Sequence, residues 1–142
     1  MSKKIIECVP NISEGRDEDK IRIISQIVEE VDGVKLLNVD PGKATNRTVI
    51  TFVGEPQQVI DAAFLLIQKA QELIDMSKHS GEHPRMGATD VCPLVPISNI
   101  SMDEVVIVHM LNSFKHLMSN PQASFISKSS ITELEESREA RS

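Results

Sequence analysis

The stretch that decides the fold is residues 47–74, RTVITFVGEPQQVIDAAFLLIQKAQELI. Residues 47–54 alternate as a strand does when one of its faces is buried. Pro56 suits the first turn of a helix, because the N–H that proline lacks would have no helical partner there. The apolar residues that follow recur at helical spacing over about five turns: Val59, Ile60, Ala63, Phe64, Ile67, Ala70, Leu73 and Ile74. We therefore predict a strand that leads directly into a long amphipathic helix.

Two strands and a helix are predicted before this stretch. Residues 4–9 are β-rich and bounded by a proline, and residues 11–16 follow as a polar loop. Asp17 is a plausible N-cap for a helix that carries apolar residues at helical spacing and ends at Gly33. Residues 34–39 then form the next strand, and a turn joins it to residue 47. The two strands on either side of this turn make a hairpin.

After the long helix we predict a fourth strand over residues 91–97 and a third helix over residues 105–118, capped by Ser101 and Glu104. The element order is β-α-β-β-α-β followed by a helix. This order is typical of an α+β fold with a ferredoxin-like antiparallel or mixed sheet and helices packed on one face. We expect one domain over residues 1–120 and a polar, flexible tail over residues 121–142.

The composition is that of a globular protein without a nucleic-acid or membrane partner. Of 142 residues, 40% are hydrophobic and 25% are charged, an ordinary balance for a folded domain. The formal net charge of -6 and the aromatic content of 3% argue against a nucleic-acid partner, which requires basic and stacking surfaces. We see no bilayer-spanning stretch and no signal peptide. Cys8 and Cys92 lie in apolar runs, so we expect reduced core thiols in a cytoplasmic protein, with a structural disulfide as the alternative.

A run of titratable residues separates the long helix from the last strand. It spans residues 75–90, DMSKHSGEHPRMGATD, and three residues interrupt any helix there: Gly81, Pro84 and Gly87. Titratable side chains on a stiff loop between core elements make a good active-site candidate. His79 and His83 have the spacing of a helical zinc site, but the breakers exclude a regular helix and no further Cys or His ligand is near. We therefore expect no metal.

Several blocks of sequence occur in a fixed order: residues 7–16 (ECVPNISEGR), 45–49 (TNRTV), 73–76 (LIDM), 81–88 (GEHPRMGA) and 90–93 (DVCP). Together they resemble the N-terminal subdomain of the glutamate formiminotransferase family, the folate-dependent enzymes of histidine degradation. The match consists of long blocks in a preserved order, so it is specific. The resemblance covers residues 4 to about 107 and then stops.

The resemblance implies a glutamate formimidoyltransferase, which moves a formimino group from N-formimino-L-glutamate to its co-substrate tetrahydrofolate in one-carbon metabolism. It also implies two similar α/β subdomains with the folate in the groove between them, and this chain matches only the first. His83 corresponds to the catalytic histidine of the family. A homo-oligomer or a separate second subdomain would then complete the groove.

The chemistry of this transfer suits a histidine. The N5 amine of tetrahydrofolate attacks an amidine carbon, and a proton must move from N5 to the departing glutamate nitrogen. A histidine whose pKa is near neutrality acts first as general base and then as general acid. Asp40 is our candidate to hold the other ring nitrogen. Carboxylates on both substrates favour Arg47 and Arg85 as anchors, and the neutral hydrogen-bonding candidates are Asn11, Ser13 and Asn46.

Three interpretations of the function stay open at this point. The chain has the family activity, with a formimino or a formyl group transferred. It is a non-catalytic folate-binding module that keeps His83 but lacks the opposite wall. Or it is an inactive fragment from a gene whose reading frame shifted after about Ile107, since residues 108–142 do not match the family pattern. A hydrolase triad of Ser13, His83 and Asp40 is disfavoured because Ser13 lacks a nucleophile elbow.

Overall fold

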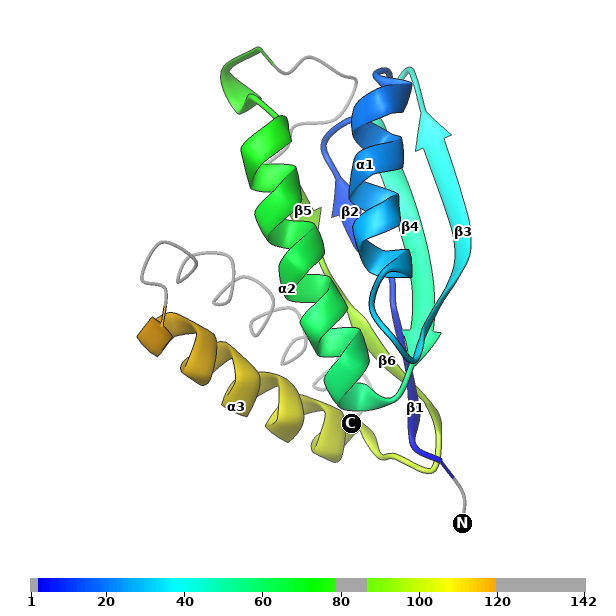
Figure 1. The fold of residues 1–142 in the computed structure, drawn as a ribbon, viewed down its shortest axis with the longest axis vertical. Coiled ribbons are helices and arrows are strands. Elements are labelled where there is room, and N and C mark those ends of the chain that lie inside the picture. Colours follow the sequence, from blue (N-terminus) through cyan, green and yellow to red (C-terminus); the bar gives the residue numbers. More distant parts are fainter. Residues whose placement is uncertain (1–2, 79–86, 120–142) are drawn as a thin grey trace.

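The structure, a computed structural model, describes residues 3–78 and 87–119, with side chains through Ser113. Helices lie in front of a curled antiparallel sheet (Figure 1). The elements in chain order are β1 (Ile5–Cys8), β2 (Asn11–Ile12), α1 (Glu18–Glu29), β3 (Val34–Gly42), β4 (Arg47–Gly54), α2 (Pro56–Leu73), the 3-10 turn η1 (Met76–Lys78), β5 (Thr89–Val91), β6 (Leu94–Ser98) and α3 (Met102–Ser119).

Strand β4 is the centre of the sheet and pairs along both of its edges. One edge takes β3, from Val34 opposite Gly54 to Gly42 opposite Arg47. The other edge takes β1 and then β2, and outside these lie β6 and β5. All of these pairs are antiparallel. As a result, β1 and β2 form one interrupted strand beside β4. Strands β6 and β5 form a second interrupted strand outside them.

Prolines cause both breaks, because a proline has no N–H to donate to a neighbouring strand. Pro10 separates β1 from β2, although its carbonyl oxygen still accepts the N–H of Ile50 at 3.0 Å. Pro93 separates β5 from β6, and its carbonyl oxygen accepts the N–H of Val9 at 3.1 Å. The prediction of one strand over residues 91–97 is therefore wrong in detail, and so is the prediction of a loop from residue 11.

The predicted mixed class is confirmed: strands and helices alternate, and the sheet is antiparallel. The ferredoxin-like topology itself stays a prediction. Helix α1 begins where its cap was predicted, with the Asp17 carboxylate accepting the N–H of Asp19 at 3.1 Å and of Lys20 at 3.2 Å. Helix α2 has Pro56 in its first turn, as predicted. Helix α1 ends earlier than expected, because Gly33, with φ of 84°, belongs to the turn that enters β3.

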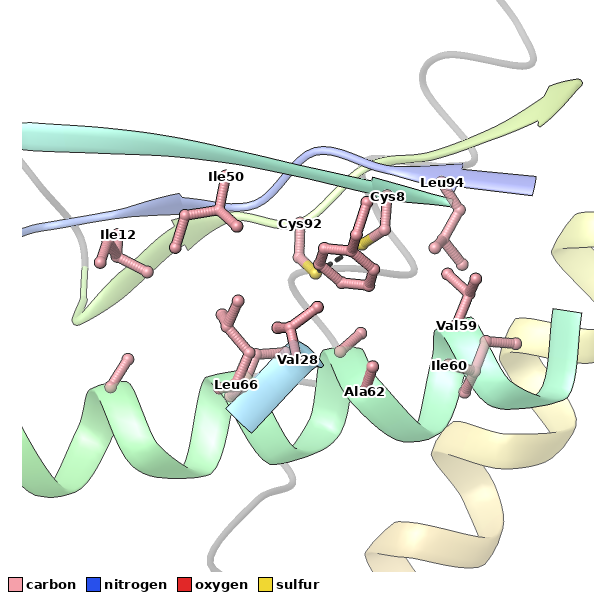
Figure 2. Close-up of a cluster of buried hydrophobic side chains, with 14 of the residues drawn as sticks. Cys8, Ile12, Val28, Ile50, Val59, Ile60, Ala62, Leu66, Cys92 and Leu94 are labelled. Carbon is pink, nitrogen blue, oxygen red and sulfur yellow. Dashed lines mark hydrogen bonds between the residues drawn. The ribbon is translucent and has the colours of Figure 1, made fainter. Parts of the chain in front are cut away.

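The core lies between the sheet and the helices (Figure 2). Residues 48, 50, 52 and 54 of β4 are buried and point to the helices, whereas residues 47, 49, 51 and 53 are half-buried and point away. Ile50 and Phe52 are fully buried against helix residues such as Val59 and Leu66. We call the side that residues 47, 49, 51 and 53 occupy the outer face. Within the described part of the chain, no helix packs on the outer face.

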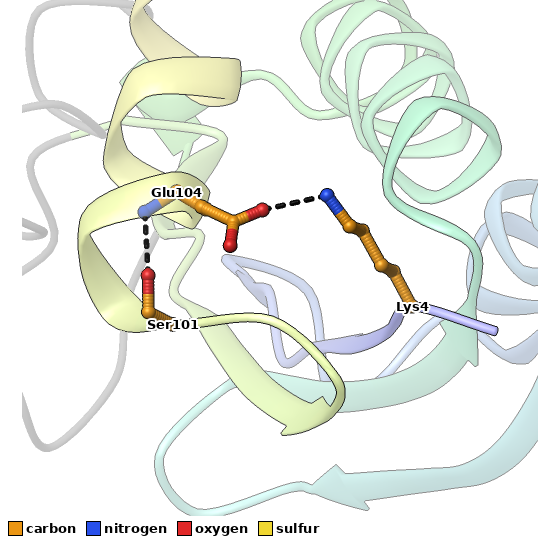
Figure 3. Close-up of polar contacts among 3 residues, drawn as sticks. All are labelled: Lys4, Ser101 and Glu104. Carbon is orange, nitrogen blue, oxygen red and sulfur yellow. Dashed lines mark hydrogen bonds and ion pairs between the residues drawn. The ribbon is translucent and has the colours of Figure 1, made fainter. Parts of the chain in front are cut away.

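Helix α3 is capped by one hydrogen bond and joined to the start of the sheet by one ion pair (Figure 3). The predicted N-cap Ser101 accepts the N–H of Glu104 at 3.1 Å. The Glu104 carboxylate lies 2.7 Å from the ammonium group of Lys4, next to β1. Among the helices of the described residues, none is both long and apolar enough to cross a membrane.

Candidate functional site

Three of the predicted site residues meet on the outer face of the sheet. Asp40 of β3 lies opposite Val49 of β4, and Val49 lies opposite Asn11 of β2. Directly opposed residues of an antiparallel pair point to the same face, with their Cα atoms about 5 Å apart. Arg47 is two positions before Val49 on the same strand, so it shares this face at about 7 Å. The register therefore gathers Asn11, Asp40 and Arg47 around Val49.

These three side chains differ in their surroundings. Asp40 is exposed, whereas Asn11 and Arg47 are half-buried. The Asn11 amide group donates to the carbonyl oxygen of Val9 at 3.2 Å, which orients it across the break between β1 and β2. A carboxylate, a guanidinium and an amide thus lie on three neighbouring strands of the outer face, and the guanidinium and amide suit a ligand with carboxylates.

Asn46 lies at the tip of the β3–β4 hairpin and joins it to the loop after β2. Its φ of 51° is in the left-handed region, which asparagine tolerates better than most residues. The side chain is 7% exposed, and its Oδ1 atom accepts the N–H of Gly15 at 2.9 Å. Asn46, a predicted ligand contact, therefore connects two backbone segments in this structure.

Gly15 allows the loop to approach the hairpin this closely. A Cβ atom at this position would lie 2.3 Å from the carbonyl oxygen of Gly42 and 2.6 Å from the backbone nitrogen of Arg47. Both contacts are far shorter than side-chain atoms tolerate, and both neighbours are backbone. Only glycine fits between the loop and the hairpin tip.

Ser13 connects the same loop to the segment that precedes β5. Its side chain is 1% exposed, and its hydroxyl donates to the carbonyl oxygen of Gly87 at 2.7 Å. Its backbone N–H donates to the carbonyl oxygen of Ala88 at 2.8 Å. Two consecutive carbonyl groups are thus held by one residue.

Thr48 is a site residue that the sequence analysis missed. It is fully buried, and its hydroxyl donates to the carbonyl oxygen of Glu14. The signal was present in the sequence, because Thr48 occupies an inward position of a strand whose other inward positions are apolar. Glu14 stiffens the loop further, since its carboxylate accepts the N–H groups of Arg16 and Asp17, each at 3.1 Å.

The predicted catalytic residue His83 and the predicted anchor Arg85 lie outside the described residues, as does His79. The chain on either side of them is described. Before them, the Asp75 carboxylate accepts the N–H of Ser77 at 3.0 Å and its hydroxyl at 2.6 Å. These hydrogen bonds from Ser77 lower the pKa of Asp75, because they stabilise its charged form. After them, Ser13 holds residues 87 and 88.

His109 of α3 is a buried histidine in the apolar core. The residue is 5% exposed and borders a small pocket whose other lining residues are apolar or a thiol: Ile60, Ala63, Phe64, Ile67, Cys92 and Leu94. Burial lowers its pKa to about 4, since the charged imidazolium loses its hydration there. Within the described residues its Nε2 atom has no hydrogen-bond partner.

Cys8 and Cys92 are buried core thiols with their sulfur atoms 3.6 Å apart, and they do not form a disulfide (Figure 2). Burial raises the pKa of Cys8 well above its usual value, so this thiol is protonated and a poor nucleophile. In residues 3–78 and 87–119, no three His, Cys, Asp or Glu side chains form a group that could hold a metal ion.

The described residues form a mixed α/β unit with polar residues gathered on the outer face of its sheet. The chain belongs to the formiminotransferase family, because the family profile described as "Formiminotransferase domain, N-terminal subdomain" matches residues 5–119. This match extends beyond Ile107, where the resemblance read from the sequence stops.

Relatives from distant organisms agree with the family. The chain is 56% identical over 103 residues to the formimidoyltransferase-cyclodeaminase of Dictyostelium discoideum, which covers 72% of this chain and 19% of that protein. It is 50% identical over 103 residues to the glutamate formimidoyltransferase of Streptococcus pyogenes serotype M1, which covers 72% of this chain and 34% of that protein. The corresponding enzyme of Thermoplasma acidophilum is 49% identical over 102 residues. The chain therefore spans about a fifth to a third of the length of these relatives.

Proposed function

We propose that this chain contributes one wall of a folate-dependent active site that transfers a formimino group from N-formimino-L-glutamate to tetrahydrofolate. The observation that carries the proposal is the gathering of Asn11, Asp40 and Arg47 on the outer face, in a chain of the formiminotransferase family. Two of the relatives are named glutamate formimidoyltransferase, after this activity.

The proposed reaction balances with one histidine. The N5 atom of tetrahydrofolate attacks the amidine carbon of N-formimino-L-glutamate and forms the new N–C bond. His83 removes the proton from N5, and it returns a proton to the glutamate nitrogen as the old C–N bond breaks. Asp40 accepts a hydrogen bond from the other ring nitrogen, fixes the tautomer and stabilises the imidazolium.

Arginines and amides of the same wall bind the substrates in this proposal. Arg47 and Arg85 each form bidentate hydrogen bonds with a glutamate-type carboxylate. Asn11 supplies a neutral hydrogen bond, whereas Asn46 and Ser13 are buried and hydrogen-bonded to backbone. The half-buried position of Arg47 on the outer face supports its part, because a partly desolvated guanidinium binds carboxylate more strongly.

The outer face is our proposed position for the opposite wall of the groove. It carries half-buried valines beside the polar residues, and an opposing surface would bury both. We propose that a second subdomain or another copy of the chain supplies this surface. The buried, protonated thiols suit a reducing compartment, so we place the protein in the cytoplasm.

The test is an assay of the purified chain for 5-formiminotetrahydrofolate, with His83→Ala and the matched control His79→Ala. We expect turnover that His83→Ala lowers about 10²- to 10⁴-fold, the usual effect of a lost general acid–base, and that His79→Ala leaves unchanged. Turnover that survives His83→Ala would contradict the catalytic assignment.

A non-catalytic folate-binding module is the second candidate. Calorimetric titration with tetrahydrofolate separates the two candidates. Binding without turnover supports the module. Sedimentation with and without tetrahydrofolate then shows whether a second copy closes the groove.

A further inference from the structure

We propose that Ser13 is a positioning residue for the formimino transfer, not a ligand contact. In this role it holds residues 87 and 88 against the hairpin that carries Asp40 and Arg47. The inference rests on the proposed function and deepens it, because it assigns the work of one residue of the proposed site.

The surroundings of Ser13 leave no surface for a substrate. The residue is 1% exposed, and its hydroxyl hydrogen is directed to the carbonyl oxygen of Gly87 at 2.7 Å. The backbone N–H adds a second bond, to Ala88 at 2.8 Å. A buried hydroxyl with a short bond to backbone acts on the chain, and substrate is kept away from it.

The loop that carries Ser13 is fixed from the opposite side. Thr48 donates its hydroxyl to the carbonyl oxygen of Glu14, and Asn46 accepts the N–H of Gly15 at 2.9 Å. Gly15 itself fits against the hairpin backbone with no room for a Cβ atom. Ser13 is therefore bonded to residues 87 and 88, whereas the next two residues, Glu14 and Gly15, are bonded to the hairpin.

This arrangement makes Ser13 the link between two parts of the proposed site. Arg47 begins β4, immediately beside Asn46, and Asp40 is on the paired strand β3. Residue 87 follows His83 by only four positions in the sequence. A shift of about 1 Å in a group that acts on substrate lowers the rate by about a hundredfold. We therefore expect the loss of the anchor at residue 87 to lower kcat.

Ser25 provides a matched control. It is also a buried serine, 7% exposed, and its hydroxyl donates to the carbonyl oxygen of Ile21 at 2.8 Å, inside α1. Ser13→Ala and Ser25→Ala therefore each remove one buried hydroxyl-to-carbonyl bond. Any general loss of stability is shared by the two variants, whereas an effect on residues 87–88 is specific to Ser13. Ser13→Cys adds a graded step, because a thiol is a weak donor of similar size.

The experiment compares amide hydrogen exchange and steady-state kinetics of the full chain and the three variants. In Ser13→Ala we expect about tenfold faster exchange in peptides that cover residues 87–90, with an intermediate effect in Ser13→Cys and none in Ser25→Ala. We expect kcat to fall about tenfold or more in Ser13→Ala while the KM for tetrahydrofolate changes less than about twofold.

Each outcome decides something definite. Equal exchange in Ser13→Ala and Ser25→Ala would overturn the anchor. Faster exchange with unchanged kcat, or a raised KM at constant kcat, would overturn the positioning role. A wild-type chain without turnover would overturn the proposed function instead, and the exchange data would still decide whether Ser13 holds residues 87–88.

Discussion

The buried imidazole of His109 predicts a specific loss of stability in acid. Its pKa is about 4 in the folded chain, against 6.5 for an exposed histidine, because burial disfavours the charged ring. The residues that line its pocket carry no charge that could offset this effect. Between these two pH values the unfolded chain binds a proton that the folded chain excludes. Stability is therefore complete above about pH 6.5 and falls as the pH drops towards 4.

The size of the effect follows from the two pKa values of His109. A difference of about 2.5 pKa units corresponds to a full effect of about 3.4 kcal/mol. The linkage relation puts about 1.4 kcal/mol of this loss at pH 5.5 and about 2.6 kcal/mol at pH 4.5. These losses are a large fraction of the stability of a typical domain, so the transition should shift visibly.

Urea unfolding of the wild type and His109→Gln, followed by circular dichroism from pH 7.5 to 4.5, measures this effect. Glutamine keeps a polar group in the pocket but does not titrate, and the other histidines are common to both chains. We expect the difference in unfolding free energy between the two proteins to shift by about 2.6 kcal/mol against the wild type at the acid end. A difference that does not change with pH would refute the assignment of a buried, neutral His109.

The remaining predictions concern the loop after β2 and the start of α3. Gly15→Ala should destabilise the chain by about 2 kcal/mol or more, because its Cβ atom would meet hairpin backbone at 2.3 Å. Gly87→Ala should stay within about 0.5 kcal/mol, because among the described residues the nearest atom to its Cβ would be 3.9 Å away. Equal urea midpoints for these two variants would contradict the close approach. Ser101→Ala should cost about 1 kcal/mol through loss of the cap, and Lys4→Ala less, because its ion pair is about half exposed. A larger loss for Lys4→Ala would reverse this ranking.

Local sequence signals predicted most element boundaries because local contacts set them. Asp17 caps α1, Pro56 starts α2 and Ser101 caps α3, as the sequence indicated. Residues 47–54 form the predicted strand with the predicted alternation. A cap or a first-turn proline acts on hydrogen-bonding groups within a few residues, so its effect is readable without the rest of the fold.

The errors arose where a distant strand or helix decides the outcome. Residues 11 and 12 look like part of a polar loop, yet β4 and β5 pair with them on both sides. The apolar run over residues 91–97 looks continuous, yet Pro93 divides it between two partners. The burial of His109 likewise depends on residues of α2 and the sheet that are distant in the sequence.

The candidate site divides in the same way. The sequence alone predicted which residues carry the chemistry, since the blocks that resemble the formiminotransferase family contain His83, Arg47 and Asn11. Only the tertiary structure decided that Asp40 joins Asn11 and Arg47 on one face, because the pairing register across β3, β4 and β2 sets that arrangement. Only the tertiary structure assigned Ser13 to backbone contacts, since a hydroxyl serves a ligand or the chain according to which acceptor lies within about 3 Å of it.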